Sequence, residues 1–248
     1  MPRKLYGGPT DANGRRLYPG AESRGSELAW DVFMIPVPQV GASFAALLAD
    51  NYLKYVGHPI GTPHSSVADI QFTVREFDRL TQEGVKGNAM SLDLDRFRRS
   101  GGKLIMWHGW DDQSIPATGT LDYYQRLWQH NGGLRATQEW ARVFMVPTLY
   151  HCAFGGYRLN EFDPFPQLVD WVEHSQAPDR ITANQRDTQG NVIRSRPVFS
   201  YPLRAKYDGT GSVDEASNFI AARPLLPPHD TIQWVGTDLY TTPGPVAP

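Results

Sequence analysis

Short apolar runs alternate with amphipathic segments in the second half of the chain. Residues 103–108 (KLIMWH) and 142–147 (RVFMVP) are apolar runs of strand length, and glycines precede and follow the first. Residues 118–130 and 165–175 carry apolar side chains at helical spacing. Short apolar runs are typical of strands buried on both faces, and the order strand, helix, strand, helix is typical of a parallel sheet. The pattern therefore predicts an α/β fold.

The first half of the chain has weaker periodicity. Residues 1–40 are rich in glycine, proline and charge, which predicts loops and short elements. Residues 42–56 have apolar positions at helical spacing, with Ser43 as the expected N-cap. Weaker helical patterns cover residues 75–82 and 93–99. This half is therefore expected to be helical and loop-rich.

The polar and proline-rich tail begins at Arg186. It includes an aromatic stretch at residues 198–201, and it predicts loops that wrap the surface and a short strand or two. The last residues, 241–248, are expected to fray because nothing in their pattern ties them down.

The composition permits a sizeable core and excludes several classes of partner. The 248 residues are 40% hydrophobic and 12% aromatic, and the formal net charge is −2. Such a balance does not favour nucleic acid or an anionic membrane surface as partner. No apolar run approaches the ~18 residues of a membrane span, and the first residues lack the apolar core of a signal peptide. The protein is therefore expected to be cytoplasmic, or to have its true N-terminus outside this sequence.

Two polar loops follow the predicted strands. Asp111 and Asp112 come after the first strand, and His151 comes after the second, 39 residues beyond Asp112. Active residues of open parallel sheets lie beyond the carboxyl ends of the strands, and an acid followed by a histidine is the order of an α/β-hydrolase triad. Either aspartate could instead belong to a solvated turn or cap the next helix, and His151 could be a polar residue of a surface loop.

The sequence around these residues resembles the tannase and feruloyl esterase family, from about Tyr6 to Phe219. The resemblance rests on a Gly-Gly-Lys strand that leads into His-Gly-Trp and the acid, on a second strand with a His-Cys pair, and on motifs in the next helix, the tail and the N-terminal part. These motifs are Gly101 to Asp112, Phe144 to Pro147, His151-Cys152, Pro164 to Ile181, Arg196-Pro197, Tyr201-Pro202 and Gly14 to Gly20.

The resemblance implies a fold and a mechanism. Residues 91–248 would form the C-terminal portion of an α/β-hydrolase parallel sheet, and residues 1–90 would form part of a lid domain. Asp112 and His151 would be the acid and the base of a Ser-Asp-His esterase that cleaves esters of hydroxycinnamic or gallic acids. Asp111 occupies the variable position of the motif, so we predict that Asp112, and not Asp111, hydrogen-bonds the ring of His151.

The serine of that triad is absent from this sequence. The chain has neither a G-x-S-x-G motif nor a Cys-Ser pair, so an N-terminal segment or another chain would have to carry the nucleophile. The alternatives are a truncated, non-catalytic fragment or pseudoenzyme of the same family, and another α/β-hydrolase subfamily with a different acyl group. The full-length protein would be secreted or periplasmic, as the family implies.

The family also gives an expectation for Cys152, the single cysteine. By itself it is either an inert buried thiol or one half of a disulfide whose partner lies on a missing segment. In the family, the cysteine after the histidine is bonded to the cysteine before the serine, and Cys152 matches the first of these positions. The calcium loop of some members lies upstream, so no metal and no cofactor are expected in this chain.

Aromatic residues of the N-terminal part are candidates for substrate contact. A flat phenolic acid would gain from stacking on such rings, and Trp30 and Phe33 near the Gly-Ser-Glu turn are the residues expected to provide them. The alternative is that these rings form the small core of the lid.

Overall fold

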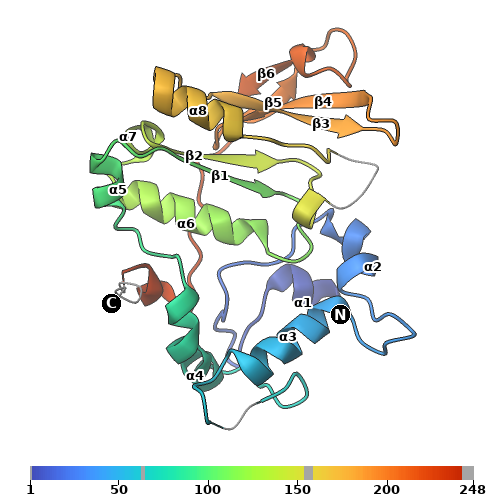
Figure 1. The fold of residues 1–248 in the computed structure, drawn as a ribbon, viewed down its shortest axis with the longest axis vertical. Coiled ribbons are helices and arrows are strands. Elements are labelled where there is room, and N and C mark those ends of the chain that lie inside the picture. The colour runs from blue at the N-terminus through green and yellow to red at the C-terminus, as the bar shows by residue number, and fades with distance from the viewer. Residues whose placement is uncertain (1, 63–64, 154–158, 242–248) are drawn as a thin grey trace.

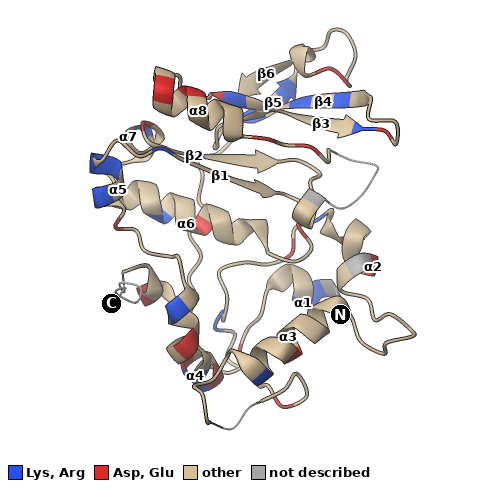
Figure 2. Ribbon diagram, viewed as in Figure 1, with Lys and Arg blue, Asp and Glu red and all other residues tan. Residues whose placement is uncertain are grey.

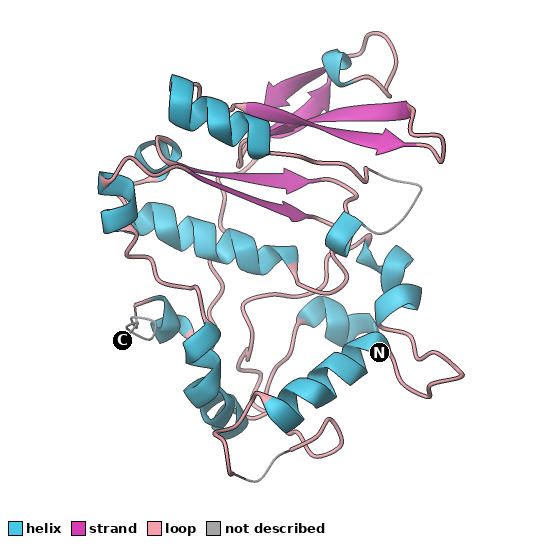
Figure 3. Cartoon of the chain, in the orientation of Figure 1, coloured by secondary structure: helices cyan, strands magenta, loops and turns pink. Residues whose placement is uncertain are grey.

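The computed structural model describes residues 2–62, 65–153 and 159–241. Three parts follow one another along the long axis of the molecule: two β-hairpins with a helix, a pair of parallel strands with a helix, and a region of helices and loops (Figure 1). The strands all lie in the first two of these parts (Figure 3). The fraying expected at residues 241–248 falls, apart from Thr241, outside the described residues.

The parallel pair is the centre of the fold. Strand β1 (Leu104–Gly109) pairs in parallel with β2 (Ala141–Val146), and helices α6 (Ala117–His130) and α7 (Leu134–Gln138) connect them. The predicted strands and the predicted helix between them are confirmed, and α7 is an element that the sequence pattern did not reveal. The predicted α/β fold class is therefore confirmed.

Side chains on the two faces of this pair enter two different cores, because successive residues of a strand point to opposite sides. Val143 and Met145 pack with Leu121, Tyr124 and other buried residues of α6. Phe144 and Val146 point the other way and pack with Ile181, Ala183 and Val198 of the next hairpin. The short apolar runs of the sequence are thus strands covered on both faces, as the pattern predicted.

Two antiparallel strand pairs near the C-terminus correct the prediction of a mostly irregular tail. After α8 (Phe165–His174), strand β3 (Arg180–Arg186) pairs antiparallel with β4 (Val192–Phe199), and β5 (Arg204–Tyr207) pairs antiparallel with β6 (Phe219–Ala222). The side chains of β3 alternate between buried and outward-facing, but one of its buried positions is polar Gln185. The period-2 alternation is therefore hidden when only hydrophobicity is considered.

The N-terminal region consists of short helices and loops, as expected. Its elements are α1 (Pro2–Gly7), η1 (Ser26–Ala29), α2 (Trp30–Phe33), α3 (Phe44–Tyr55), α4 (Val74–Gly84), η2 (Val85–Gly87) and α5 (Asp95–Arg99). Ser43 caps α3 by accepting a hydrogen bond from the Ala46 backbone N–H at 3.2 Å, so the predicted N-cap is confirmed. Charges of both signs lie along α4, whereas α5 is mostly basic (Figure 2).

The C-terminal segment returns to the centre of the molecule. The fully buried carboxylate of Asp122 on α6 accepts hydrogen bonds from Arg126, from the Ile232 backbone N–H at 2.6 Å and from the Tyr240 hydroxyl. The short 3₁₀ helices η4 (Ala216–Asn218) and η5 (Thr237–Tyr240) lie in this tail. Buried carboxylates are tolerated where hydrogen bonds satisfy them, and the bonds from Ile232 and Tyr240 fasten the tail onto α6.

Candidate active site

A close approach of two loops builds the site at the carboxyl ends of β1 and β2. A Cβ added to Gly109 would collide with the carbonyl oxygen of Leu149, so only glycine lets the end of β1 pack against the loop after β2. The Trp110 backbone N–H donates to the Val146 carbonyl at 2.9 Å, which continues the strand pairing by one residue. The acid loop and the histidine loop therefore emerge side by side.

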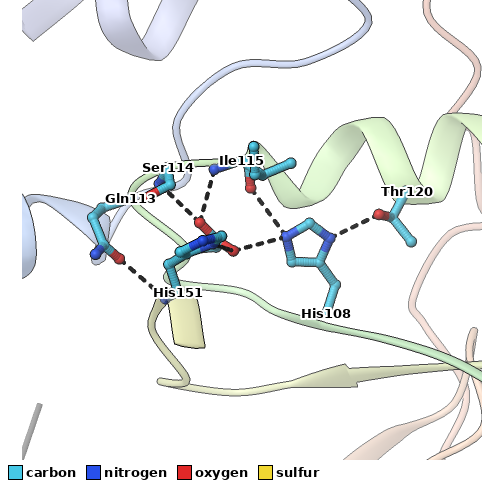
Figure 4. Close-up of polar contacts among 7 residues, drawn as sticks. His108, Gln113, Ser114, Ile115, Thr120 and His151 are labelled. Atoms are coloured by element: carbon cyan, nitrogen blue, oxygen red, sulfur yellow. Dashed lines mark hydrogen bonds and ion pairs between the residues drawn. The ribbon is translucent and has the colours of Figure 1, made fainter. Parts of the chain in front are cut away.

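Four donors hold Asp112, and the residues that supply them are labelled in Figure 4. Its Oδ1 accepts hydrogen bonds from the backbone N–H groups of Ser114 and Ile115, both at 2.8 Å. Its Oδ2 accepts one from Nδ1 of His151 at 2.9 Å and a longer one from His108 at 3.2 Å. The residue is only 7% exposed, so its orientation is set by these partners rather than by water. The predicted hydrogen bond between Asp112 and His151 is present.

The hydrogen bonds also decide the charge of Asp112. Burial alone would raise the pKa of this carboxyl, but the bonds from His108, the Ile115 N–H, His151 and the Ser114 N–H outweigh it and lower the pKa to about 2. Asp112 is therefore ionised at neutral pH. A carboxylate can only accept, so Nδ1 of His151 carries the proton that lies between them.

His151 keeps its other ring nitrogen available. It begins the short 3₁₀ helix η3 (His151–Ala153), and its side chain is 37% exposed. Its backbone N–H donates to Oε1 of Gln113, at 3.1 Å, and Gln113 is itself 2% exposed. With Nδ1 protonated and bonded to Asp112, the neutral ring has its lone pair on Nε2. The ring can therefore accept a proton from a donor that approaches Nε2.

We expect the ionised carboxylate of Asp112 to make the stability of the protein depend on pH below 4. The pKa of Asp112 is lowered from its usual 3.8 to about 2, so its contribution is complete above pH 4 and is lost as the pH falls towards 2. The difference corresponds to about 2 kcal/mol of unfolding free energy. Urea denaturation of the wild type and of Asp112→Asn between pH 5 and pH 2 measures it. The wild type should lose about 2 kcal/mol more than the variant over this range, and parallel curves would contradict the assignment.

Asp111 faces a different part of the molecule. A Cβ added to Gly25 would lie 2.7 Å from Oδ1 of Asp111, so this carboxylate packs directly against the backbone of the N-terminal region. Gly25 also has a φ of 110°, a conformation that favours glycine. The adjacent aspartates are therefore divided between two tasks: Asp112 contacts His151, and Asp111 contacts the segment that precedes η1.

Sequence reasoning missed two residues that contact the pair. His108 is the next-to-last residue of β1, and its ring bonds both Asp112 and Thr120. Gln113 supports the backbone of His151, as described above. The sequence presents His108 only as part of the His-Gly-Trp motif, although the alternation of β1 already places its side chain on the same face as Met106, towards α6. Nothing in the sequence pattern distinguishes Gln113 from an ordinary loop residue.

The two predicted substrate-contacting rings pack within the N-terminal region. The indole N–H of Trp30 donates to the Ser26 hydroxyl at 3.2 Å, and its ring lies 5.6 Å from that of Tyr6. Phe33 packs edge-on against Phe44, with 5.6 Å between ring centroids. Both side chains are half-buried. These contacts fit the alternative of a lid core, and a substrate contact stays a prediction.

Cys152 is an exposed free thiol directly after His151, so the expectation of an inert buried thiol is wrong. Its φ of 53° turns the backbone sharply behind the histidine. Among the described residues, three or more histidine, cysteine, aspartate or glutamate side chains do not gather into a metal-binding group. Over the same ranges, the helices are too short or too polar to cross a membrane.

The fold and the site define a class of protein. Parallel strands whose carboxyl-end loops carry a hydrogen-bonded acid and histidine, in that chain order, are the arrangement typical of an α/β-hydrolase fold. The sequence model of the tannase and feruloyl esterase family matches residues 2–222. The chain belongs to this family.

Similar proteins are named as esterases or related hydrolases. A mono(2-hydroxyethyl) terephthalate hydrolase from Piscinibacter sakaiensis is 40% identical over 138 residues, covering 55% of this chain and 22% of that protein. A probable feruloyl esterase from Arthroderma benhamiae is 25% identical, covering 84% of this chain and 41% of that protein. The crystal structure of feruloyl esterase B from Aspergillus oryzae superposes with a TM-score of 0.71 at 24% identity, covering 88% of this chain and 44% of the other. The chain therefore spans less than half the length of these relatives.

Proposed function

We propose that the protein is the acid–histidine part of a serine carboxylesterase that cleaves esters of aromatic acids. The observation that carries the proposal is the 2.9 Å hydrogen bond between Asp112 and His151, in the loops where an α/β-hydrolase has its acid and base. Membership of a family named for two esterase activities supports the same reaction.

His151 would act first as a base and then as an acid. Its Nε2 would take the proton of a serine hydroxyl as the serine oxygen attacks the ester carbonyl, forming a tetrahedral intermediate. The same proton would pass to the departing alcohol oxygen as the carbon–oxygen bond breaks and an acyl-enzyme remains. Water would then repeat the cycle and release the acid. Asp112 would keep the ring in the required tautomer and stabilise the imidazolium, which its ionised state and its four hydrogen bonds support.

The serine would come from a segment or chain outside these 248 residues. Within the described ranges, β1 pairs with β2 on one side only. An unpaired strand edge is a template for another strand. We propose that the nucleophile-bearing part adds a parallel strand to β1, and that the exposed thiol of Cys152 bonds a cysteine beside that serine. Such a bond would hold serine and histidine at the separation that proton transfer requires.

The acyl group is proposed to be an aromatic acid. The relatives are named as feruloyl esterase, tannase and mono(2-hydroxyethyl) terephthalate hydrolase, and the acids that these names imply share an aromatic ring conjugated with the ester carbonyl. Trp30 and Phe33 are the proposed ring contacts, and their half-buried rings retain surface on which a flat acid could stack.

A substrate panel tests this proposal. The protein expressed from its complete reading frame should hydrolyse methyl ferulate, methyl gallate or mono(2-hydroxyethyl) terephthalate faster than an aliphatic ester such as ethyl butyrate, and His151→Ala should abolish the activity. Preference for the aliphatic ester would favour a subfamily with another acyl group. A reading frame that encodes no serine nucleophile, together with no turnover, would favour the non-catalytic fragment and overturn the proposal.

A further inference from the structure

The ring of His108 reaches the same carboxylate oxygen that holds His151, at 3.2 Å against 2.9 Å (Figure 4). We infer that His108 is a positioning residue: it fixes the carboxylate of Asp112 and limits the basicity of His151, without itself contacting the reacting atoms. The inference deepens the proposed function and rests on it for its catalytic consequence. Its structural consequence concerns three described residues and can be tested without any substrate.

The location of His108 follows from the strand that carries it. Leu104, Met106 and His108 occupy alternate positions of β1, and the two apolar ones pack against the core that includes α6. His108 therefore points at α6, where its Nδ1 lies 2.7 Å from the hydroxyl of Thr120. A ring anchored between a strand and a helix is more rigid than a ring on a loop, and the imidazole is only 11% exposed.

The partners of His108 determine where its proton lies. Nε2 is 3.0 Å from the carbonyl oxygen of Ile115, which can only accept, so Nε2 carries a hydrogen. That hydrogen is shared between Ile115 O and Oδ2 of Asp112. Thr120 then completes the set by donating its hydroxyl proton to the unprotonated Nδ1. A neutral His108 with its hydrogen on Nε2 satisfies all three contacts. These contacts therefore do not require a positive charge on His108.

The shared oxygen couples the two histidines. A donor at Oδ2 withdraws electron density that would otherwise stabilise the imidazolium of His151, and removing it should make His151 more basic. Other ionisable groups also face Asp112: the charge of Asp112 contributes to the raised pKa values of Tyr18 and Glu22, after the larger effect of their burial. Both remain in every variant below, so they do not alter the comparison.

The test is the titration of His151 in the 248-residue chain, followed by NMR with ¹⁵N-labelled histidine. His108→Leu removes the donor, and we expect the midpoint of His151 to rise by about one pH unit. His108→Gln brings an amide N–H close to the position of Nε2, and it should restore the midpoint to within about 0.3 units of the wild type. His58, which contacts Ser65 at 3.0 Å in the N-terminal region, is an internal reference that should not move.

Thr120→Val supplies a milder variant in case His108→Leu does not fold. It leaves His108 in place but removes the hydroxyl that holds Nδ1, so His151 should titrate between the wild type and His108→Leu.

In the complete enzyme, His108→Leu should lower kcat about tenfold with little change in KM, because an acid held less firmly affects the transition state more than substrate binding. Unchanged titration of His151 in His108→Leu, or in Thr120→Val where the leucine variant is unfolded, would overturn the inference. If the complete wild-type protein showed no esterase activity but His151 still titrated higher in His108→Leu, the proposed function alone would be refuted.

Discussion

Replacing Asp112 by asparagine should lower kcat/KM for an aromatic ester about 10⁴-fold in the complete enzyme, as the equivalent change does in known triads. The amide would keep the size of the side chain, but its –NH₂ group cannot accept the proton that His151 donates from Nδ1. The ring would then favour the opposite tautomer, with the hydrogen on Nε2, and could no longer take a proton from serine. The loss should appear in kcat, because the tautomer matters for the chemical step and not for substrate binding.

Asp111→Asn is the matched control for this experiment. The two aspartates are adjacent and both are 7% exposed, but Asp111 packs against Gly25 whereas Asp112 bonds His151. The control should therefore lose less than about tenfold in kcat/KM, in line with a carboxylate that packs against Gly25. Steady-state kinetics of both variants on methyl ferulate would check this. A larger loss in Asp111→Asn than in Asp112→Asn would show that the acid has been misassigned.

The sequence is informative where one hydrophobic period dominates. The strands at residues 103–108 and 142–147 and the helix between them are predicted within one or two residues, because each is apolar on the sides that become buried. The contact between Asp112 and His151 is predictable for a related reason. Parallel strands bring their carboxyl ends to one edge, and the resemblance to a known family selects Asp112 over its neighbour.

The remainder depends on contacts that no single segment encodes. Strand β3 escapes prediction because its buried face includes the polar Gln185, whose burial depends on the folded hairpin. His108 can be assigned a contact only once α6 and the acid loop enclose it, since Thr120 lies 12 residues away on the helix and Ile115 lies on the loop. Roles that arise from three elements meeting are therefore found from coordinates, whereas roles carried by one loop can be found from sequence.

The 248-residue chain by itself should show no esterase turnover. The chemistry requires a hydroxyl within reach of Nε2 of His151, and several serines of the chain are engaged or enclosed elsewhere. Ser43 caps α3, Ser65 contacts His58, and the hydroxyl of Ser114, although close to Asp112 in sequence, is buried. Under the proposed mechanism, a triad without a nucleophile retains only the weak catalysis of binding groups, and the backbone donors of an oxyanion hole normally adjoin the catalytic serine.

The measurement is hydrolysis of methyl ferulate and methyl gallate by the purified chain, in parallel with labelling by a fluorophosphonate probe, which reacts covalently with activated serines. We expect rates equal to those of buffer and no labelled band. Supplying the nucleophile-bearing segment as a second polypeptide should restore both signals, because it would complete the sheet at β1 and bring a serine to His151. Turnover by the chain alone that is lost in His151→Ala would contradict the prediction, and the probe-labelled peptide would then identify a serine of this chain as the nucleophile.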